Sequence, residues 1–328
     1  MEKIATSVLE TYNARIARFS NPTTEDRVIT LFELGSGTGI FTRLFANYFA
    51  NFLQNIHENE VRKGFQSPKL RFRIICIEPL PSMRDQFTVT LTKKLNSPNI
   101  DPLEKEALQC LIVSDGSATA MPSSDQLVAL CAQQSPSCPS GSFRHVDGIL
   151  MAQAFHWFAT TEALTSMAEV LDPSAKAYII WNRYRDIPGT WHSEVFDKII
   201  DPLYNAQDVP SQLGIDWEKA FREHRQYQKT LGKKLYFNPH PDHFKYDGVT
   251  YYFDEEELRQ RFSTVSVVAS LPPEQKAKTL ENIVNLTRKY IADHPNSNRR
   301  PGEPVIHPEK EFVMRYIVDL HIAALEED

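Results

Sequence analysis

The sequence lacks an excess of positive charge, a signal peptide and any apolar run long enough to cross a membrane. Its 328 residues carry 36 Lys and Arg against 42 Asp and Glu, which gives a net charge of −6. This balance argues against nucleic acid as the main partner, because proteins that bind it normally present a basic face. The N-terminus is already charged, as Met1-Glu-Lys-Ile. We therefore expect a cytoplasmic protein without a membrane partner.

Cysteine is scarce and shows no metal-binding spacing. The four cysteines, Cys76, Cys110, Cys131 and Cys138, form no C-x-x-C pair, so reduced structural thiols inside a cell are the favoured interpretation. His240 and His243 have the spacing of two metal ligands. No third ligand at helical or strand spacing is visible, so we expect a polar loop there and no metal.

The glycine-rich segment lacks the residues that mark the two common nucleotide loops. Gly35, Gly37 and Gly39 follow an apolar run. A dinucleotide fingerprint needs a third glycine where Ile40 stands, which disfavours a nicotinamide oxidoreductase. A phosphate-binding Walker loop needs Gly-Lys-Ser/Thr, and no lysine follows the glycines here.

What is present at this segment is a strand, a glycine turn and a helix. Residues 28–34 read as a buried strand, and apolar residues recur at helical spacing over 40–48. This geometry brings backbone amides close to a ligand at the helix N-terminus. The carboxylate of Glu33 at the strand end can attract an ammonium, and amides of the turn can receive a carboxylate. A tight strand–helix turn without a ligand is the alternative.

Strands and helices alternate over the first 182 residues. Strands are expected at Val28–Leu34, Phe72–Ile77, Leu111–Asp115, Val146–Ala152 and Ala177–Trp181, with helices at 3–19, 40–48 and 161–171. Asp172-Pro173 is expected to separate the last helix from the last strand, and 133–142 to form an exposed loop. This alternation predicts an α/β fold with a parallel, doubly wound sheet.

The pattern changes after residue 182. Residues 183–245 are rich in aromatic side chains without clear alternation, a helix is expected over 274–291, and Phe312–Leu320 reads as a final strand. We therefore expect three parts: an N-terminal helix and cofactor-binding core over 1–182, a mostly helical cap over 183–300 that covers the substrate, and a strand within 301–328 that completes the core sheet.

Four segments together resemble a known family. Glu33 to Gly39, acidic-x-Gly-x-Gly-x-Gly, resembles the first motif of class I S-adenosylmethionine-dependent methyltransferases. Glu78 ends the second strand, where such enzymes commonly bind both ribose hydroxyls, and Pro79 and Met83 follow it as candidates to line the adenine slot. An ordinary strand-end carboxylate is the alternative for Glu78.

The third and fourth segments follow the next strands. Ser114 to Pro122 resembles the family's Gly-Asp-Ala-x-x-Leu-Pro segment; because Ser117 stands at the acidic position, the adenine contact is expected to be weaker or to come from Asp115. Asp147 to Phe158 resembles the Asp-x-x-x-x-x-Gln-Ala-x-His-Trp signature of proteins similar to trans-aconitate methyltransferase. The resemblance implies a Rossmann-like class I methyltransferase fold, S-adenosylmethionine as cofactor and a small-molecule acceptor.

The resemblance also implies site residues. Cofactor contacts are expected at Glu33, Gly35, Ser36, Gly37, Thr38, Gly39, Glu78, Pro79, Met83, Asp115, Ser117, Ala118, Ala152, Gln153 and Ala154. Substrate contacts are expected at His156, Trp157 and Arg183, with packing under the cap as the alternative for Trp157 and a surface ion pair for Arg183. His156 is a candidate to position the substrate or act as a base.

The reaction expected from these segments is methyl transfer to an oxygen of a carboxylate or hydroxyl. A carboxylate is already ionised at neutral pH and needs no base, so positioning is expected to supply most of the rate. Two alternatives remain: a cofactor-binding but inactive interaction protein, and a methyltransferase that acts on proteins. A monomer and a homodimer are both compatible with the sequence.

Overall fold

The computed structural model describes residues 1–21, 27–65, 69–134, 146–183, 188–208, 217–233, 235–298 and 309–327. Most of the loop expected at 133–142 lies outside these residues, and so does Cys138. The other three cysteines, Cys76, Cys110 and Cys131, are buried free thiols, as expected. None of the described helices combines the length and apolar character needed to span a membrane.

The chain forms two compact units: Met1–Ile180 with Asp216–His243 and His321–Asp328, and Trp181–Ile215 with Phe244–Leu320. The first unit contains these elements, some of which run on into the second: α1 (Glu2–Ile16), β1 (Val28–Leu34), α2 (Ile40–Arg62), β2 (Arg71–Ile77), α3 (Pro81–Leu95), α4 (Pro102–Gln109), β3 (Leu111–Ser114), α5 (Ser124–Gln134), β4 (Val146–Ala152), the 3₁₀ helix Phe155–Trp157, α6 (Thr161–Val170), β5 (Leu171–Arg183), α9 (Trp217–Thr230), β6 (Leu235–Phe237) and β8 (Phe312–Glu327).

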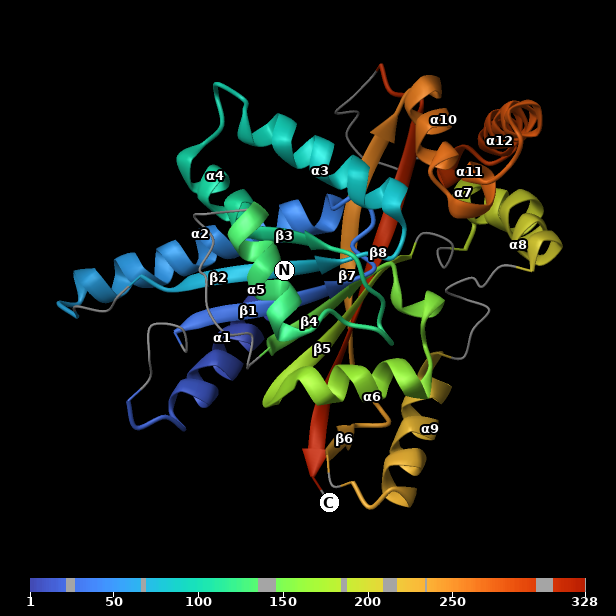
Figure 1. Ribbon diagram of the computed structural model, residues 1–328. Coiled ribbons are helices and arrows are strands. Elements are labelled where there is room, and N and C mark those ends of the chain that lie inside the picture. Colours follow the sequence, from blue (N-terminus) through green and yellow to red (C-terminus); the bar gives the residue numbers. More distant parts are fainter. Residues whose placement is uncertain are drawn as a thin grey trace. The chain divides into compact units, whose positions relative to one another are not determined.

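The sheet has the strand order β3-β2-β1-β4-β5-β8-β6, and β7 (Asp242–Phe253) pairs with β8. Strands β1 to β5 run parallel, with Leu34 opposite Ile77 and Leu31 opposite Gly148. In Figure 1 they form a twisted sheet with helices of the first unit beside it. The chain moves outward from β1 to β2 and β3, then returns to the other side of β1 for β4, so the order reverses beside β1. This is the predicted doubly wound α/β fold.

The central strands are mostly apolar because both faces of the sheet are covered. Every residue of β1 is buried, and so are Ile74, Ile75 and Ile77 of β2. Helix α2 covers this sheet with a stripe at helical spacing in which Phe45 and Phe49 are fully buried and their rings stack at 5.6 Å.

A buried ion pair fixes α1 to the sheet. Arg15 Nε lies 2.6 Å from Asp147 Oδ1, and both side chains are almost fully buried. The backbone N–H of Thr30 donates to Asp147 Oδ2 at 2.8 Å. Asp147, the first residue of the fourth sequence segment, is therefore a structural residue that joins α1, β1 and β4.

Strand β5 is longer than predicted and includes Asp172-Pro173. The register between β4 and β5 shifts between Val146 and Gly148, which is the signature of a bulge. A bulge accommodates a proline that a regular ladder would exclude. Asp172 Oδ1 also accepts from the N–H of Ser174 at 3.0 Å, so the dipeptide is held within the strand instead of ending it.

The second unit has its own apolar core. The second unit contains α7 (Trp191–Val195), the π-helix Phe196–Ile200, α8 (Asp201–Gln207), α10 (Glu255–Ser263), α11 (Ser266–Ala269), α12 (Pro273–Asp293), the 3₁₀ helix Pro295–Ser297, most of β7 and the first part of β8. Trp191 is fully buried at the centre, packs on Phe262 and Phe312, and donates from Nε1 to the carbonyl of Val313 at 2.9 Å.

The units divide the chain differently from the three expected parts. Helix α9 and strand β6 lie in the first unit, where His224 of α9 contacts Thr165 of α6 at 3.4 Å. Strand β8 extends seven residues beyond Leu320, and this extension pairs with β6. His243, expected in a polar loop, lies in β7, and its ring stacks on that of His321 with centroids 4.1 Å apart. Strand pairing explains this contact, which spacing along the chain did not predict.

Candidate functional site

Four of the predicted segments meet at the carboxyl ends of the parallel strands. Glu33 and the glycine turn end β1, Glu78 follows β2, Asp115 follows β3 and Gln153 follows β4. In open α/β sheets ligands bind at this edge, where the strand order reverses. The topology therefore places the predicted cofactor residues where such a fold binds ligands.

The turn after β1 requires glycine at two positions for lack of space. Gly35, Gly37 and Gly39 all have positive φ, of 69°, 54° and 73°. A Cβ on Gly35 would lie 2.6 Å from the Cβ of Ala154, and one on Gly39 would lie 2.4 Å from the Phe87 ring. The turn is thus packed tightly between the segment after β4 and helix α3.

Glu78 is hydrogen-bonded to the glycine turn. Its Oε2 accepts from the backbone N–H of Gly37 at 2.9 Å, and its Oε1 accepts from the N–H of Leu80 at 3.0 Å. The residue is only 5% exposed. A carboxylate has about four lone-pair sites, so each oxygen can accept one further hydrogen bond. Glu78 both shapes the turn and keeps acceptor capacity for a ligand.

Most amides of the turn are already used. The N–H groups of Gly35 and Ser36 donate to the carbonyl of Ile77, and that of Gly39 donates to the carbonyl of Ser36. Gly37 donates to Glu78, so the N–H groups that can still receive a ligand carboxylate are those of Thr38 and the first residues of α2. The first N–H groups of a helix have no partner within it. Helix α2 also carries no acidic residue in its first turn.

Glu33 is a buried acid beneath the turn. It is 1% exposed, and its Oε2 has no hydrogen-bond partner among the described residues. Burial raises the pKa of its carboxyl to about 8, and the nearby Thr42 hydroxyl and Arg43 guanidinium oppose that shift while Glu78 adds to it. The buried hydroxyl of Ser36 also has no partner in the described structure. Buried polar atoms normally have a hydrogen-bond partner, and a bound ligand or water can supply one here.

Arg84, which sequence reasoning did not single out, joins the ends of β2 and β3. Its Nη1 donates to the carbonyl of Glu78 at 2.6 Å and lies 2.8 Å from Asp115 Oδ1. The carboxylate of Asp115 is largely exposed, so it can still contact a ligand. The only sequence signal for Arg84 was a cation in the first turn of the helix after Glu78.

The other residues that are expected to contact the adenine differ in how exposed they are to solvent. Pro79 and Met83 are exposed beside Glu78. Ala118 is buried, and the Ser117 hydroxyl accepts from the N–H of Ala120 at 3.1 Å within a tight turn. The Ser117 hydroxyl is thus engaged inside the loop, which leaves Asp115 as the more accessible of the two polar candidates.

Gln153 has an unusual backbone conformation. Its φ is +57°, one of two positive values among the described non-glycine residues, and its N–H donates to the carbonyl of Ile180 at 2.9 Å. Strain of this kind is concentrated at functional sites. Ala152 before it is half-buried, and Ala154 after it is buried against Gly35.

His156 and Trp157 lie in the short 3₁₀ helix after β4. Burial lowers the pKa of the His156 imidazole to about 4, so the ring is neutral at pH 7. The Trp157 ring lies 5.1 Å from it and is half exposed. Phe155, which precedes them, packs on Trp217 and Phe221 of α9. These ring contacts join the 3₁₀ helix to α9 within the first unit. The structure thus presents a neutral imidazole and an exposed indole next to the strained Gln153.

Arg183 has a protein partner in the second unit. Its Nη1 lies 2.9 Å from Oδ2 of the fully buried Asp319. This corresponds to the ion-pair alternative, although the partner is buried and not at the surface. Contact of Arg183 with a substrate stays a prediction.

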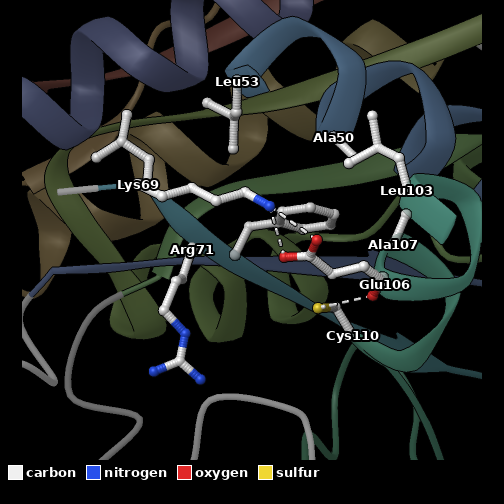
Figure 2. A pocket seen from close by; sticks show the side chains of 10 residues that line it. Ala50, Leu53, Lys69, Arg71, Leu103, Glu106, Ala107 and Cys110 are labelled. Atoms are coloured by element: carbon white, nitrogen blue, oxygen red, sulfur yellow. Dashed lines mark hydrogen bonds and ion pairs between the residues drawn. The ribbon is translucent and has the colours of Figure 1, made fainter. Parts of the chain in front are cut away.

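A separate hollow lies at the opposite end of β2 (Figure 2), with a volume of about 50 Å³. It is lined by Ala50, Leu53, Lys69, Leu70, Arg71, Phe72, Leu103, Glu106, Ala107 and Cys110. Lys69 reaches across to Glu106, with Nζ 2.7 Å from Oε2, whereas Arg71 points away. Burial raises the pKa of the Cys110 thiol to about 12, so it is not a nucleophile. This hollow is not part of the site.

Two uncharacterised proteins of Schizosaccharomyces pombe are similar to the chain. One, named methyltransferase-like, is 29% identical over 253 residues, covering 77% of this chain and 70% of its own. The other, named a methyltransferase, is 27% identical over 220 residues, or 66% of this chain and 68% of its own. No family model matches the chain.

Solved structures are less similar. The YcgJ protein of Bacillus subtilis is 13% identical, with 98% of this chain and 99% of that one covered and a TM-score of 0.43. A phosphoethanolamine N-methyltransferase of Haemonchus contortus, solved with S-adenosylhomocysteine, is 11% identical, with 96% and 52% covered and a TM-score of 0.37. These scores are too low to carry an argument, so the fold assignment depends on the strand order itself.

Proposed function

We propose that this chain, a homologue of curated methyltransferases with the class I methyltransferase fold, transfers a methyl group from S-adenosylmethionine to an oxygen of a small carboxylate or hydroxyl compound. The observation that carries this proposal is the 2.9 Å hydrogen bond between Gly37 N–H and Glu78 Oε2. It joins the glycine turn to the carboxylate after β2, although the two bonded residues are 41 positions apart in the sequence.

The residues at the carboxyl edge fit the cofactor's polar groups. The free lone pairs of Glu78 suit the two ribose hydroxyls, and hydrogen bonds to a charged acceptor are worth about 1.5–3 kcal/mol each. The N-terminal amides of α2 suit the carboxylate of the methionine tail. The unpartnered Oε2 of Glu33 suits its ammonium. Pro79, Met83 and Asp115 are exposed where the adenine would lie.

When bound, the cofactor would supply an electrophilic methyl group for transfer to the acceptor oxygen. The protein's task is to orient the acceptor and exclude water, which can supply about 7–11 kcal/mol. With a pKa of about 4, His156 is a poor general base at pH 7, because efficient bases have a pKa near the working pH. This favours a positioning role for His156 and an acceptor that is already ionised.

The test is incubation with isotope-labelled S-adenosylmethionine and a panel of small carboxylic acids, phenols and alcohols, read by mass spectrometry. We expect a labelled methyl ester or ether from at least one small compound, together with S-adenosylhomocysteine. A matched reaction with Glu78→Gln should give much less product. If the wild type binds the cofactor but methylates none of the panel, an inactive or protein-directed role replaces the proposal.

A further inference from the structure

Glu33 combines burial, a carboxyl oxygen (Oε2) without a hydrogen-bond partner among the described residues, and a position beside the glycine turn. We propose that Glu33 carries a proton in the ligand-free protein and releases it when the ammonium of the methyl donor binds, so that donor binding liberates one proton. This inference rests on the proposed function, because it needs a ligand with an ammonium at the turn. It adds that the donor's affinity depends on pH through this one residue.

The position of Glu33 isolates it from water. It lies in the central strand β1, opposite Cys76 of β2 and Leu150 of β4. Its exposure is 1%, and those of Cys76 and Leu150 are 0%. Burying an ionised carboxylate without compensating partners is so costly that the group takes up a proton instead.

The groups that face Glu33 compensate only part of a negative charge on its carboxyl. Helix α2 contributes the Thr42 hydroxyl and the Arg43 guanidinium, but Arg43 Nη1 donates to the carbonyl of Thr38 at 2.8 Å. From β2 and its end come the buried thiol of Cys76 and the carboxylate of Glu78, whose charge repels a second carboxylate. The pKa of about 8 for Glu33 agrees with this environment.

An ammonium close to Oε2 would make the ionised form of Glu33 more stable than the protonated form. An opposite charge within about 4–6 Å favours the ionised carboxylate. The reaction is balanced: the neutral acid and the donor's ammonium become a carboxylate–ammonium pair, and the proton passes to the buffer. Because the acid must ionise first, donor affinity should rise about tenfold from pH 6 to pH 7. His156 does not titrate in this interval, since its pKa is about 4.

The test is calorimetric titration of S-adenosylhomocysteine at pH 6.5 in buffers of different ionisation enthalpy, which counts the protons released on binding. At this pH the ligand's own α-amino group is already almost fully protonated. We expect close to one proton released per ligand bound by the wild-type protein. Methylthioadenosine, which has the adenosine but neither ammonium nor carboxylate, should bind without releasing a proton.

Two variants assign the proton to its residue. Glu33→Gln keeps the shape of the side chain and should release no proton, with an affinity that is flat between pH 6 and pH 7. Glu58→Gln removes an acid at the exposed end of α2 and should release as many protons as the wild type. The methylthioadenosine comparison needs no variant, so proton release on binding of methylthioadenosine would overturn the inference even if Glu33→Gln fails to fold.

The outcomes separate the two proposals. Binding of S-adenosylhomocysteine without proton release, or release that persists in Glu33→Gln, would overturn this inference and leave the proposed function standing. A complete absence of binding at 1 mM ligand, about the weakest affinity of interest, would overturn both.

Discussion

Glu78 has two tasks at the scale of single residues. It holds the N–H groups of Gly37 and Leu80, and it keeps acceptor capacity for a ligand's hydroxyls. A substitution here therefore affects the shape of the turn as well as the contact with the ligand. These two tasks constrain the residue more strongly than the proposed contact with the ribose alone.

Glu78→Gln should weaken S-adenosylhomocysteine binding by about 10- to 100-fold, because an amide loses one acceptor oxygen and the charge that strengthens the bonds. The amide NH₂ would also face one of the two backbone donors. Calorimetry of the variant beside Glu58→Gln, an exposed acid of α2, measures the effect. An affinity equal to the wild type's would move the ribose contact away from Glu78.

His156→Gln separates positioning from base catalysis. A neutral ring that positions the acceptor should, when replaced, raise the acceptor's KM and lower kcat by less than about tenfold. Loss of a general base should instead lower kcat by about 10²- to 10⁴-fold. Steady-state kinetics between pH 5.5 and 8 distinguish the two, and the pH profile should keep its shape because the pKa of His156 is about 4.

At the scale of elements, the glycine turn is fixed by what packs on it. Gly39 faces Phe87 of α3, whereas a Cβ on Gly37 would meet nothing within 4 Å. Both positions have positive φ, so alanine costs backbone strain of roughly 1–2 kcal/mol at either. Only at Gly39 would the added Cβ also collide with a ring, that of Phe87.

Gly39→Ala should therefore destabilise the protein more than Gly37→Ala, by a further 1–3 kcal/mol or so, the usual cost of overpacking. Denaturant unfolding of both variants measures the difference. Combining Gly39→Ala with Phe87→Ala should remove most of the extra cost. If the two glycine variants are equally stable, α3 does not pack on the turn as described.

The sequence predicted the elements that carry strong local signals. The strand at 28–34, the glycine turn and the strand at 146–152 were located correctly, because buried parallel strands form continuous apolar runs and the glycines mark the break. The longer β5 was missed, since a proline accommodated by a bulge is indistinguishable in the sequence from one that ends a strand.

Long-range polar contacts could not be predicted from the sequence, for a different reason. Arg15 and Asp147 lie 132 positions apart, and Arg84 and Asp115 are joined only by the sheet's order. No local pattern pairs such residues. The engagement of the turn's amides likewise depends on the carbonyl of Ile77 in the neighbouring strand. The sequence therefore indicated which segments follow the parallel strands at their carboxyl ends, and the structure supplied their connections.

At the scale of the whole molecule, Glu33 should make stability depend on pH. Its folded pKa is raised from 4.5 to about 8, so the folded state binds more protons than the unfolded state between these values. Its contribution is fully present below pH 4.5 and is lost as pH rises through 8. His156 and His224, with pKa values lowered to about 4, act oppositely and below pH 6.5.

The window from pH 6.5 to 8 therefore isolates Glu33 from these histidines. Without ligand, the free energy of unfolding should fall by about 1–2 kcal/mol across it. Glu33→Gln should show a flatter profile in the same window. Urea unfolding at four or five pH values provides the measurement, and a wild-type profile that is level or rising would contradict a protonated Glu33.

We propose above that one ligand, an adenosyl amino acid, spans the turn after β1 and the carboxylate after β2. A crystal structure of the protein grown with S-adenosylhomocysteine tests it most directly. We expect electron density with the ribose hydroxyls on Glu78, the amino-acid carboxylate at the first turn of α2 and the ammonium beside Glu33. Density for the ligand at any other place, or an edge of the sheet blocked by side chains at saturating ligand, would contradict it.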